Sequence, residues 1–313
     1  MSEYRGEKEV AIVSRDAGPD LANNKSLRPR VHCREIAATD IDAVLDLLKE
    51  GFPKLPRPHW VAALDILAAR PVPEGMPRYG YMLESDGSPV GLILVIVSEV
   101  RRNGVTTIRS NGAAWYVRPD FQFYGSIPLD RTLRLLADVH LNVFPAAHTF
   151  PIIEAKGFAR FTNGISISVP ALIWRGPRAR ITNAERLSGT EHPMPDEDRT
   201  VLEDHVRAGC IALWCETLDG GYPFVFRRRM IKARLPCAQL IYCRDLEDLV
   251  RLAGPVGRYL LQRGLPTMLV ASNGRIPGVP GLYIDNKYPM YYRGRAPHQP
   301  NDLAYTEAAL FGF

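Results

Sequence analysis

The sequence lacks most of the short motifs that identify common enzyme classes. It contains no Gly-x-Ser-x-Gly elbow, no Gly-x-x-x-x-Gly-Lys-Ser/Thr loop, no His-Glu-x-x-His pair and no Gly-x-Gly-x-x-Gly turn. These absences argue against a serine nucleophile on an elbow, a P-loop nucleotide site, a zincin centre and a dinucleotide fold. A catalytic assignment therefore has to come from another pattern.

Cysteine is scarce, with 5 residues in a chain of 313, and no Cys-x-x-Cys pair or close Cys/His cluster occurs. We therefore expect no metal site and interpret the cysteines as buried free thiols. The longest apolar run, residues 89–97, is far shorter than the roughly 20 residues that a membrane-spanning helix needs. Nothing in the sequence resembles a secretory signal, so we expect a cytoplasmic protein in a reducing compartment.

The charge balance is mildly basic, with a formal net charge of +5. Basic and aromatic residues are not interleaved, so nucleic acid is not an expected partner. The densest basic run, residues 227–229, is interpreted as a solvated strand end. The alternative is an electrostatic attractor for an anionic cofactor or a carrier protein.

The length suits two domains, and composition suggests where they meet. Residues 1–30 are polar and without periodicity, which is typical of a mobile tail. Residues 31–170 form a first domain, residues 171–199 have the Gly, Pro and acidic composition of a linker, and residues 200–313 form a second domain.

Both domains are predicted to be α/β, each with a mixed sheet and helices on both faces. In the first, two helices are followed by strands and further helices. The main elements are helices near 41–48 and 60–67, strands over 79–84, 89–97 and 105–117, a helix over 128–139, a strand near 139–143, a helix over 151–156 and a strand over 158–169. The second domain repeats the order of helix, hairpin, strand, helix and strand, with a last strand over 281–292. This similarity favours a duplicated, degenerate domain.

Residues 111–127 are the most informative stretch of the chain. A strand ending at Val117 leads through a short loop into a helix that begins near Pro128. Free backbone N–H groups and the positive end of the helix dipole would then point the same way, which is the arrangement of an anion cradle. Gly125 would let the backbone approach a phosphate closely.

On three features the first domain resembles the GNAT superfamily of acyl-CoA N-acyltransferases. The element order is the first. The second is the segment from Tyr116 to Gly125, which is similar to the strand and pyrophosphate loop of that family. The third is the segment from Ile152 to Phe158, which is similar to the Leu-Tyr-Glu-Lys-x-Gly-Phe segment of many members. The resemblance covers residues 31–170 and implies that the second half is a degenerate GNAT-like repeat.

The resemblance implies an acyl-CoA donor, whose pantetheine arm pairs with a strand edge and whose diphosphate lies on the loop. The residues implied to bind it are Trp115, Tyr116, Val117, Gln122, Phe123, Tyr124, Gly125, Ser126 and Ile127. Two positions depart from the family pattern. Ile127 stands where a small residue is usual, and Ile153 stands where many members have a tyrosine that protonates the leaving thiolate.

An amine must lose a proton to attack a thioester, and backbone N–H groups near Val117 could polarise the carbonyl. Four side chains are candidates for this chemistry: His148, Tyr116, Asn111 and Glu84. We favour His148, because its ordinary pKa is nearest neutrality. Each has a structural alternative: Glu84 a solvated hairpin end, Asn111 a local backbone bond, Tyr116 a packed aromatic and His148 a helix entrance.

The sequence therefore predicts an N-acyltransferase that moves an acyl group, acetyl being favoured, from acyl-CoA to an unidentified amine. One alternative donor is a long acyl chain on a carrier protein. A second alternative is a non-catalytic GNAT-like module that binds acyl-CoA or serves assembly. Tyrosines between residues 283 and 292 could wall an acceptor cleft between the halves. A homodimer is left open.

Overall fold

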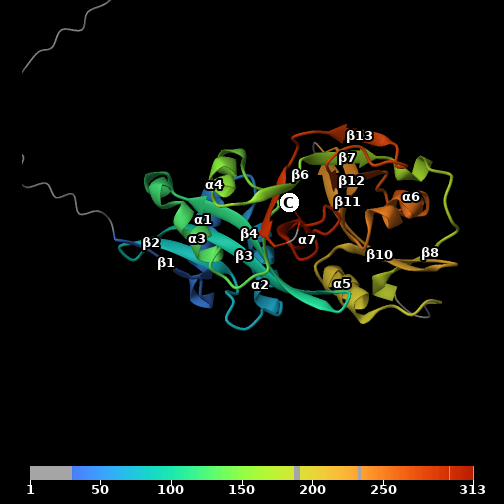
Figure 1. Ribbon diagram of the computed structural model, residues 1–313. Coiled ribbons are helices and arrows are strands. Elements are labelled where there is room, and N and C mark those ends of the chain that lie inside the picture. Colours follow the sequence, from blue (N-terminus) through green and yellow to red (C-terminus); the bar gives the residue numbers. More distant parts are fainter. Residues whose placement is uncertain (1–29, 187–190, 232–233, 296, 313) are drawn as a thin grey trace, which may run out of the picture. The chain divides into compact units, whose positions relative to one another are not determined.

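A computed structural model describes residues 30–186, 191–231, 234–295 and 297–312. The N-terminal tail expected over residues 1–30 lies outside these ranges except for its last residue. From Val31 onward the described chain forms one unit. Two seven-stranded mixed sheets with helices on their faces make up this unit (Figure 1). The predicted α/β class is confirmed.

The first sheet has the strand order β1-β2-β3-β4-β5-β14-β6. Its strands are β1 (Val31–Glu35), β2 (Gly80–Ser85), β3 (Ser88–Arg102), β4 (Val105–Val117), β5 (Val139–Asn142), β6 (Ala159–Thr162) and β14 (Met290–Gly294). All neighbouring strands run antiparallel except β4 and β5, which are parallel.

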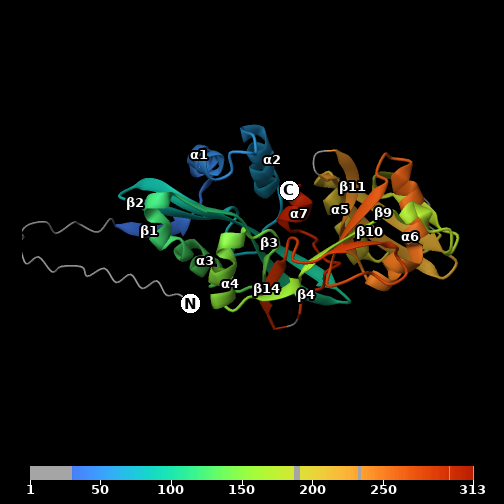
Figure 2. The same ribbon diagram turned by 90° about the horizontal axis from the view of Figure 1, so that it is seen from above.

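Helices cover both faces of this sheet. Figure 2 shows α1 (Ile41–Gly51) and α2 (Arg57–Ala69) on one face, and α3 (Ser126–Thr132) and α4 (Phe150–Ala155) on the other. The apolar positions that predict α1 and α2 are buried, Leu48 and Trp60 among them at 0% exposure. Because both faces are covered, the central run of β3 is buried continuously and does not alternate with solvent.

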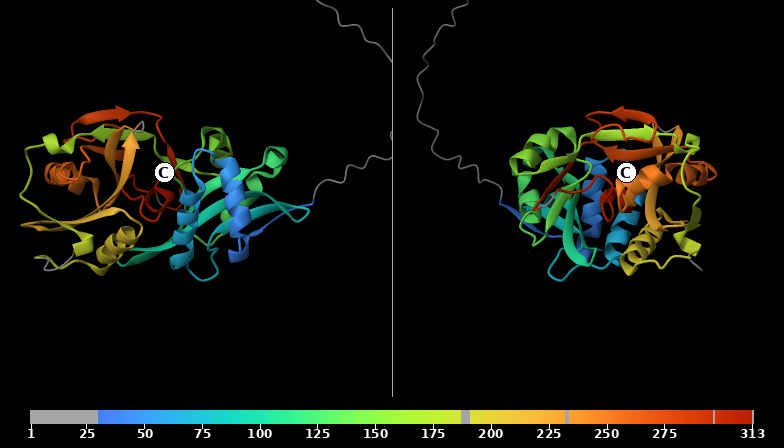
Figure 3. Two further views of the ribbon diagram at one scale, coloured as in Figure 1. Left: turned by 180° about the vertical axis from the view of Figure 1, so that it is seen from behind. Right: turned by 45° about the vertical axis from the view of Figure 1, so that its right-hand side comes forward.

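The second sheet has the order β13-β7-β12-β11-β10-β9-β8. Its strands are β7 (Gly164–Ser168), β8 (Arg180–Asn183), β9 (Ile211–Thr217), β10 (Gly220–Ile231), β11 (Leu235–Cys243), β12 (Thr267–Ser272) and β13 (Gly281–Ile284). Helix α5 (Asp196–Arg207) packs on one face and α6 (Leu246–Leu261) on the other. The short helix α7 (Glu307–Leu310) lies on the α5 side, between the two sheets, as the red helix in Figures 1 and 3 shows.

The two sheets have the same topology, which confirms the predicted GNAT-like duplication. In each, five consecutive strands lie side by side, the fourth and fifth are parallel, and one strand comes between the fifth and the sixth. That inserted strand belongs to the other half of the chain. Strand β14 fills the place in the first sheet, and β7 fills the place in the second.

This exchange corrects two predicted strands. Residues 158–169 form β6 in the first sheet and β7 in the second, and residues 281–292 cover β13 in the second sheet and the first part of β14 in the first. Apolar patterns predict strands but not their partners, because pairing is non-local. The domain boundaries of 31–170, 171–199 and 200–313 stay a prediction. The helix expected over 128–139 is also shorter, since α3 ends at Thr132.

The first crossing between the sheets takes a single residue, Asn163, between β6 and β7. Asn273 holds this point: its Oδ1 accepts from the Asn163 amide at 2.8 Å, and its Nδ2 donates to the Phe161 carbonyl at 2.9 Å. Directly after the crossing, Gly164 lies so close to β13 that a Cβ would be 2.3 Å from the Ile284 carbonyl oxygen. A side chain at this position has no room.

We predict that Gly164→Ala lowers the free energy of unfolding by about 2 kcal/mol or more, because backbone has to move to admit a methyl group. Urea denaturation measures this change in the free energy of unfolding. Gly274→Ala is the matched control, since no heavy atom lies within 4 Å of its added Cβ, and it should change stability by less than about 0.5 kcal/mol. Equal stability of the two variants would contradict the tight crossing.

Candidate active site

The candidate site lies where β4 and β5 part. The two strands pair over three residues only, Arg109 to Asn111 against Val139 to Leu141, while β4 continues to Val117. A bulge bends β4 in this stretch, with one extra residue opposite the Leu92–Leu94 segment of β3. Ala114 has a φ of +46°, a left-handed conformation that a non-glycine residue adopts rarely. The result is a gap in the sheet beside an exposed strand edge.

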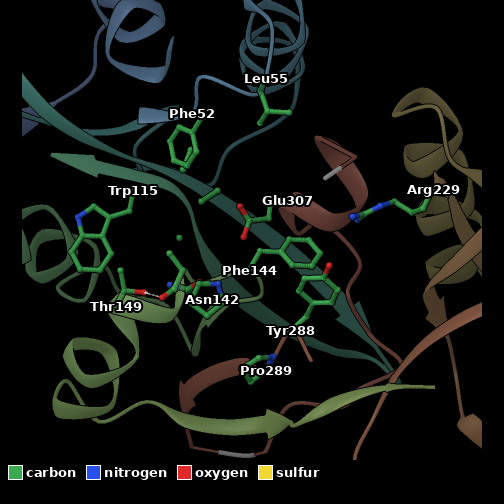
Figure 4. A pocket seen from close by; sticks show the side chains of 15 residues that line it. Phe52, Leu55, Trp115, Asn142, Phe144, Thr149, Arg229, Tyr288, Pro289 and Glu307 are labelled. Carbon is green, nitrogen blue, oxygen red and sulfur yellow. Dashed lines mark hydrogen bonds between the residues drawn. The ribbon is translucent and has the colours of Figure 1, made fainter. Parts of the chain in front are cut away.

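A cavity of about 360 Å³ occupies this gap. Its walls come from both halves of the chain, as Figure 4 shows. The lining residues are Phe52, Leu55, Gly112, Ala113, Ala114, Trp115, Asn142, Phe144, Pro145, Ala146, Thr149, Arg229, Tyr288, Pro289 and Glu307. Apolar side chains dominate, and Glu307 and Arg229 are the two charged residues of this described lining.

The Glu307 carboxyl group is buried in the wall of this cavity, with the residue 3% exposed. Burial raises its pKa to about 8, and a hydrogen bond from the Phe144 backbone opposes that shift more weakly. Figure 4 shows the carboxyl group between Phe52 and Phe144. A carboxyl group with this pKa exchanges its proton near neutral pH, which is the property of a general base.

The segment before α7 is fixed by contacts with both halves of the chain. Asp302 accepts from Arg109 Nη2 of β4 at 2.7 Å, and the Leu303 amide donates to Ile241 of β11 at 2.7 Å. The Tyr305 amide donates to Nε2 of the buried His205 at 3.2 Å. On the far side of α7, Arg227 Nη1 donates to the Ala309 carbonyl at 3.2 Å. These bonds determine where Glu307 lies.

Arg229 reaches the same cavity from β10 of the second sheet. Its Nη1 donates to Gln239 Oε1 at 2.9 Å, and its guanidinium carbon lies 5.7 Å from the centre of the Phe144 ring. Burial lowers its pKa below the ordinary value. No carboxylate of the described residues lies within ion-pair distance of it.

Several solved structures have a similar fold. A GCN5-related N-acetyltransferase from Anabaena variabilis superimposes with a TM-score of 0.57 at 8% identity, over 84% of this chain and 72% of that one. Another, from Kribbella flavida, has a TM-score of 0.53 at 14% identity over 86% and 72%. A Pyrococcus horikoshii protein, provisionally described as an acetyltransferase, has a TM-score of 0.53 at 13% identity over 91% and 97%.

The chain has the GNAT fold. No protein-family model and no curated protein sequence matches it, so this conclusion comes from structure. Identities this low establish the fold alone. The predicted resemblance is confirmed at that level, and it extends over both halves of the chain.

The GNAT fold brings the predicted catalytic residues to different places. Asn111 forms the last paired position of β4 with β5, is 2% exposed, and its side-chain amide has no hydrogen-bond partner among the described residues. Tyr116 packs against Gly51 at the end of α1, and burial raises its pKa. His148 is exposed in the short helix Ala147–Thr149, next to the cavity-lining Thr149.

Glu84 lies apart from the cavity lining. It is 7% exposed on β2, accepts from Arg34 Nε at 2.9 Å and lies 3.0 Å from His32 Nε2. At the expected solvated hairpin end, a buried carboxylate is therefore bound by two basic side chains that remain partly exposed. Because Glu84 does not line the cavity, we do not carry it into the proposed mechanism.

The loop expected to cradle a diphosphate has a different local structure. Residues Pro119–Tyr124 form a 3₁₀ helix, and Gly125 joins it directly to α3. The Phe121 and Gly125 amides donate to the carbonyls of Arg118 and Gln122, each at 2.9 Å. An amide that is already bonded to the protein is not free for an anion. Two amides of the turn are thus engaged by the protein, and the predicted cradle stays a prediction.

The nine residues predicted to bind the donor lie in different parts of the structure, and only some of them line the cavity. Trp115 lines the cavity, and its Nε1 donates to the Gly125 carbonyl at 3.0 Å. Val117 pairs with Gly91 on the β3 side. Gln122, Phe123 and Tyr124 belong to the 3₁₀ helix, with Phe123 95% exposed, and Ser126 and Ile127 open α3. Ile153 is fully buried on α4 and packs in the core with Phe158.

Sequence reasoning missed Glu307 and assigned Arg229 no site. One signal was available for Glu307, which is the lone charged residue in the apolar segment from Leu303 to Phe313. A lone charge in a buried segment is costly and so points to function. For Arg229 there was no signal, because three consecutive arginines do not reveal which one faces inward.

We predict that Glu307 makes the protein less stable as pH rises. Its folded pKa, about 8, lies above the unfolded value of 4.5, so between these pH values only the folded state keeps the proton. This stabilisation is complete below pH 4.5 and is lost as pH rises through 8. One pKa unit corresponds to about 1.4 kcal/mol, so the change amounts to a few kcal/mol.

Urea denaturation from pH 5 to 8.5 measures this effect. Glu307→Gln should remove it and become more stable than the parent at pH 8. Glu247→Gln, at an exposed carboxyl group, should follow the parent protein at every pH. A parallel pH dependence of the parent and Glu307→Gln would show that Glu307 is not buried in its neutral form.

Proposed function

We propose that this protein is an N-acyltransferase, with its reaction centre in the cavity between β4 and β5. The observation that carries the proposal is Glu307, a buried carboxyl group with a pKa of about 8 in the wall of a cavity at the parted strands of a GNAT fold. The donor is an acyl thioester of coenzyme A, with acetyl favoured, and the acceptor is an amine.

In the proposed reaction the neutral amine nitrogen attacks the thioester carbonyl carbon. A C–N bond forms, the C–S bond breaks, and the sulfur leaves as a thiolate with the electron pair of that bond. The proton lost by the amine passes to the Glu307 carboxylate. Main-chain N–H groups at the Ala114 bulge would polarise the carbonyl, in place of the predicted group near Val117, because the bulge lines the cavity and Val117 does not.

The cavity fits the acyl end of such a donor better than the turn fits its diphosphate. Its walls are apolar, and the edge of β4 beyond Asn111 is not paired with β5. The Phe121 and Gly125 amides are engaged within the turn, so a diphosphate on this loop would have to bind other donors. The proposal therefore keeps a carrier protein as an alternative source of the acyl chain, since a carrier presents its thioester without a diphosphate on this turn.

We predict that Glu307→Gln lowers kcat/KM for acyl transfer by about 100-fold or more, because general base catalysis contributes roughly 10²–10⁴. Release of free thiol from acetyl-CoA with a panel of amines measures the rate. In the parent protein kcat/KM should rise toward pH 8 as Glu307 ionises, and the variant should lose that rise. Glu247→Gln is the control, and undiminished turnover of Glu307→Gln would remove Glu307 from the mechanism.

We also predict that Trp115→Ala weakens acetyl-CoA binding about tenfold. The indole both lines the cavity and bonds the Gly125 carbonyl, so its loss opens the donor end of the site. Isothermal titration calorimetry measures the dissociation constant. Trp174→Ala, at a tryptophan that is 85% exposed and outside the cavity, is the control. Equal affinity of the two variants would place the donor elsewhere.

The second candidate function is a GNAT-like module without transfer activity. Two observations favour it: in the turn expected to bind diphosphate the Gly125 amide is bonded to the Gln122 carbonyl, and Ile153 replaces the expected proton donor. Binding of acetyl-CoA without thiol release in the presence of any amine would support this module. Thiol release that depends on Glu307 would exclude it.

A further inference from the structure

The acceptor end of the cavity is built by the second half of the chain. Glu307 comes from α7, Tyr288 and Pro289 from the segment before β14, and Arg229 from β10. Phe52 and Leu55, between α1 and α2, face them from the first half, as Figure 4 shows. The exchanged strand β14 brings Tyr288 and Pro289 to this place.

Arg229 is a charged group without a charged partner. Of the five N–H donors of a guanidinium group, one is used within the described residues, in the bond to Gln239. The Phe144 ring at 5.7 Å contributes a weak cation–π contact. Arg229 is partly buried, and its remaining N–H donors are available to a ligand in the cavity that it lines. The cavity that Arg229 lines is where the missing anion would lie.

Glu307 is not that partner. The shift in its pKa has two causes, burial and the Phe144 backbone, and a nearby positive charge is not among them. The pKa of Arg229 likewise responds to burial, Cys237, Tyr288 and Arg227, and not to Glu307. The two groups line one cavity without forming an ion pair with each other, so that a ligand between them can meet a proton acceptor and a cation at separate points.

We propose that the acceptor is a small amine that also carries a carboxylate, with an apolar body between or beside these groups, as in an apolar amino acid. Its amino group faces Glu307 and its carboxylate binds the guanidinium of Arg229. The apolar body contacts the walls formed by Phe52, Leu55 and Tyr288. This inference rests on the proposed acyltransferase function and specifies the chemical class of its acceptor.

Arg228 provides a matched control for Arg229. It precedes Arg229 on β10, is exposed, and donates to the Arg263 carbonyl at 3.2 Å. Successive side chains of a strand point to opposite faces, so Arg228 faces away from the cavity. Arg228→Gln changes the net charge as Arg229→Gln does, without removing the cation from the site.

The test compares amines with and without a carboxylate. The probes are L-phenylalanine, L-leucine and 4-(aminomethyl)benzoate, and their counterparts without a carboxylate are phenethylamine, isoamylamine and benzylamine. Thiol release from acetyl-CoA gives kcat/KM, and calorimetry without donor gives the dissociation constant. At least one acid should exceed its counterpart by about tenfold or more in either quantity, because a charge-assisted Arg–carboxylate bond is strong.

Arg229→Gln should abolish that preference, because the rate or affinity for the acid should fall to that for the amine without a carboxylate. Arg229→Lys should restore part of it, and Arg228→Gln should keep all of it. A preference that is absent in the parent protein, or that persists in Arg229→Gln, would overturn the inference. Thiol release only with the amines that lack a carboxylate would overturn it too, and would leave the proposed function intact.

If no probe releases thiol, the proposed transfer fails for these acceptors and binding decides the inference separately. Calorimetric binding of an acid that is lost in Arg229→Gln would support the acceptor class. No acid binding more tightly than its counterpart would reject it.

Discussion

The structure depends on one backbone constraint: the place between the fifth and sixth strands of each sheet has to be filled. Strand β14 fills it in the first sheet and β7 in the second, each coming from the other half of the chain. Without β14, the edges of β5 and β6 would present unpaired N–H and C=O groups, which proteins avoid. The two halves therefore support each other, and neither sheet is complete without the other half.

The exchange has a direct consequence for the cavity. The crossing from β13 to β14 brings Tyr288 and Pro289 to the first sheet, and the chain after β14 returns to place Glu307 beside the parted strands. The C-terminal segment is held there by the Arg109–Asp302 ion pair, whose side chains are both 11% exposed. The second domain thus supplies polar groups to the first. Its own helix α6 is unsuited to binding a phosphate at its N-terminus, because Glu247 and Asp248 in the first turn disfavour an anion there.

Electrostatics divides the charged groups of the chain into paired and unpaired sets. Glu84 is held by Arg34, and Asp198 is held by Arg244, so these buried acids have structural partners. Glu307 and Arg229 have no such partners in the described residues and line one cavity. Uncompensated groups cost stability, and a site that binds a ligand of complementary charge is a common reason to retain them.

Within the described residues, no cluster of side chains suited to a metal ion occurs, and no helix is long and apolar enough to span a membrane.

The sequence was sufficient for the local elements and for the fold class. Apolar spacing predicts the buried faces of α1 and α2, Asp86-Gly87 predicts the turn between β2 and β3, and element order together with the segments around Gly125 and Ile153 predicts the GNAT fold. These features depend on neighbours in the chain, where periodicity and turn preferences act. The diphosphate cradle in the 118–127 loop stays a prediction, and the sequence did not show that Pro119–Tyr124 forms a 3₁₀ helix, because a single glycine does not specify the conformation of a turn.

Only the tertiary structure shows which strands pair with each other. Strand propensity is the same whether β7 pairs with β6 or with β12, so the exchange of strands is invisible in the residues themselves. The candidate site depends on the same non-local pairing, since Glu307 and Arg229 lie far from Asn111 in the chain and meet its strand only after both sheets have formed. By itself the sequence determined which segments are helices and strands and to which fold they belong. Packing determined which charged groups are buried or line the cavity, and it therefore determined where chemistry can take place.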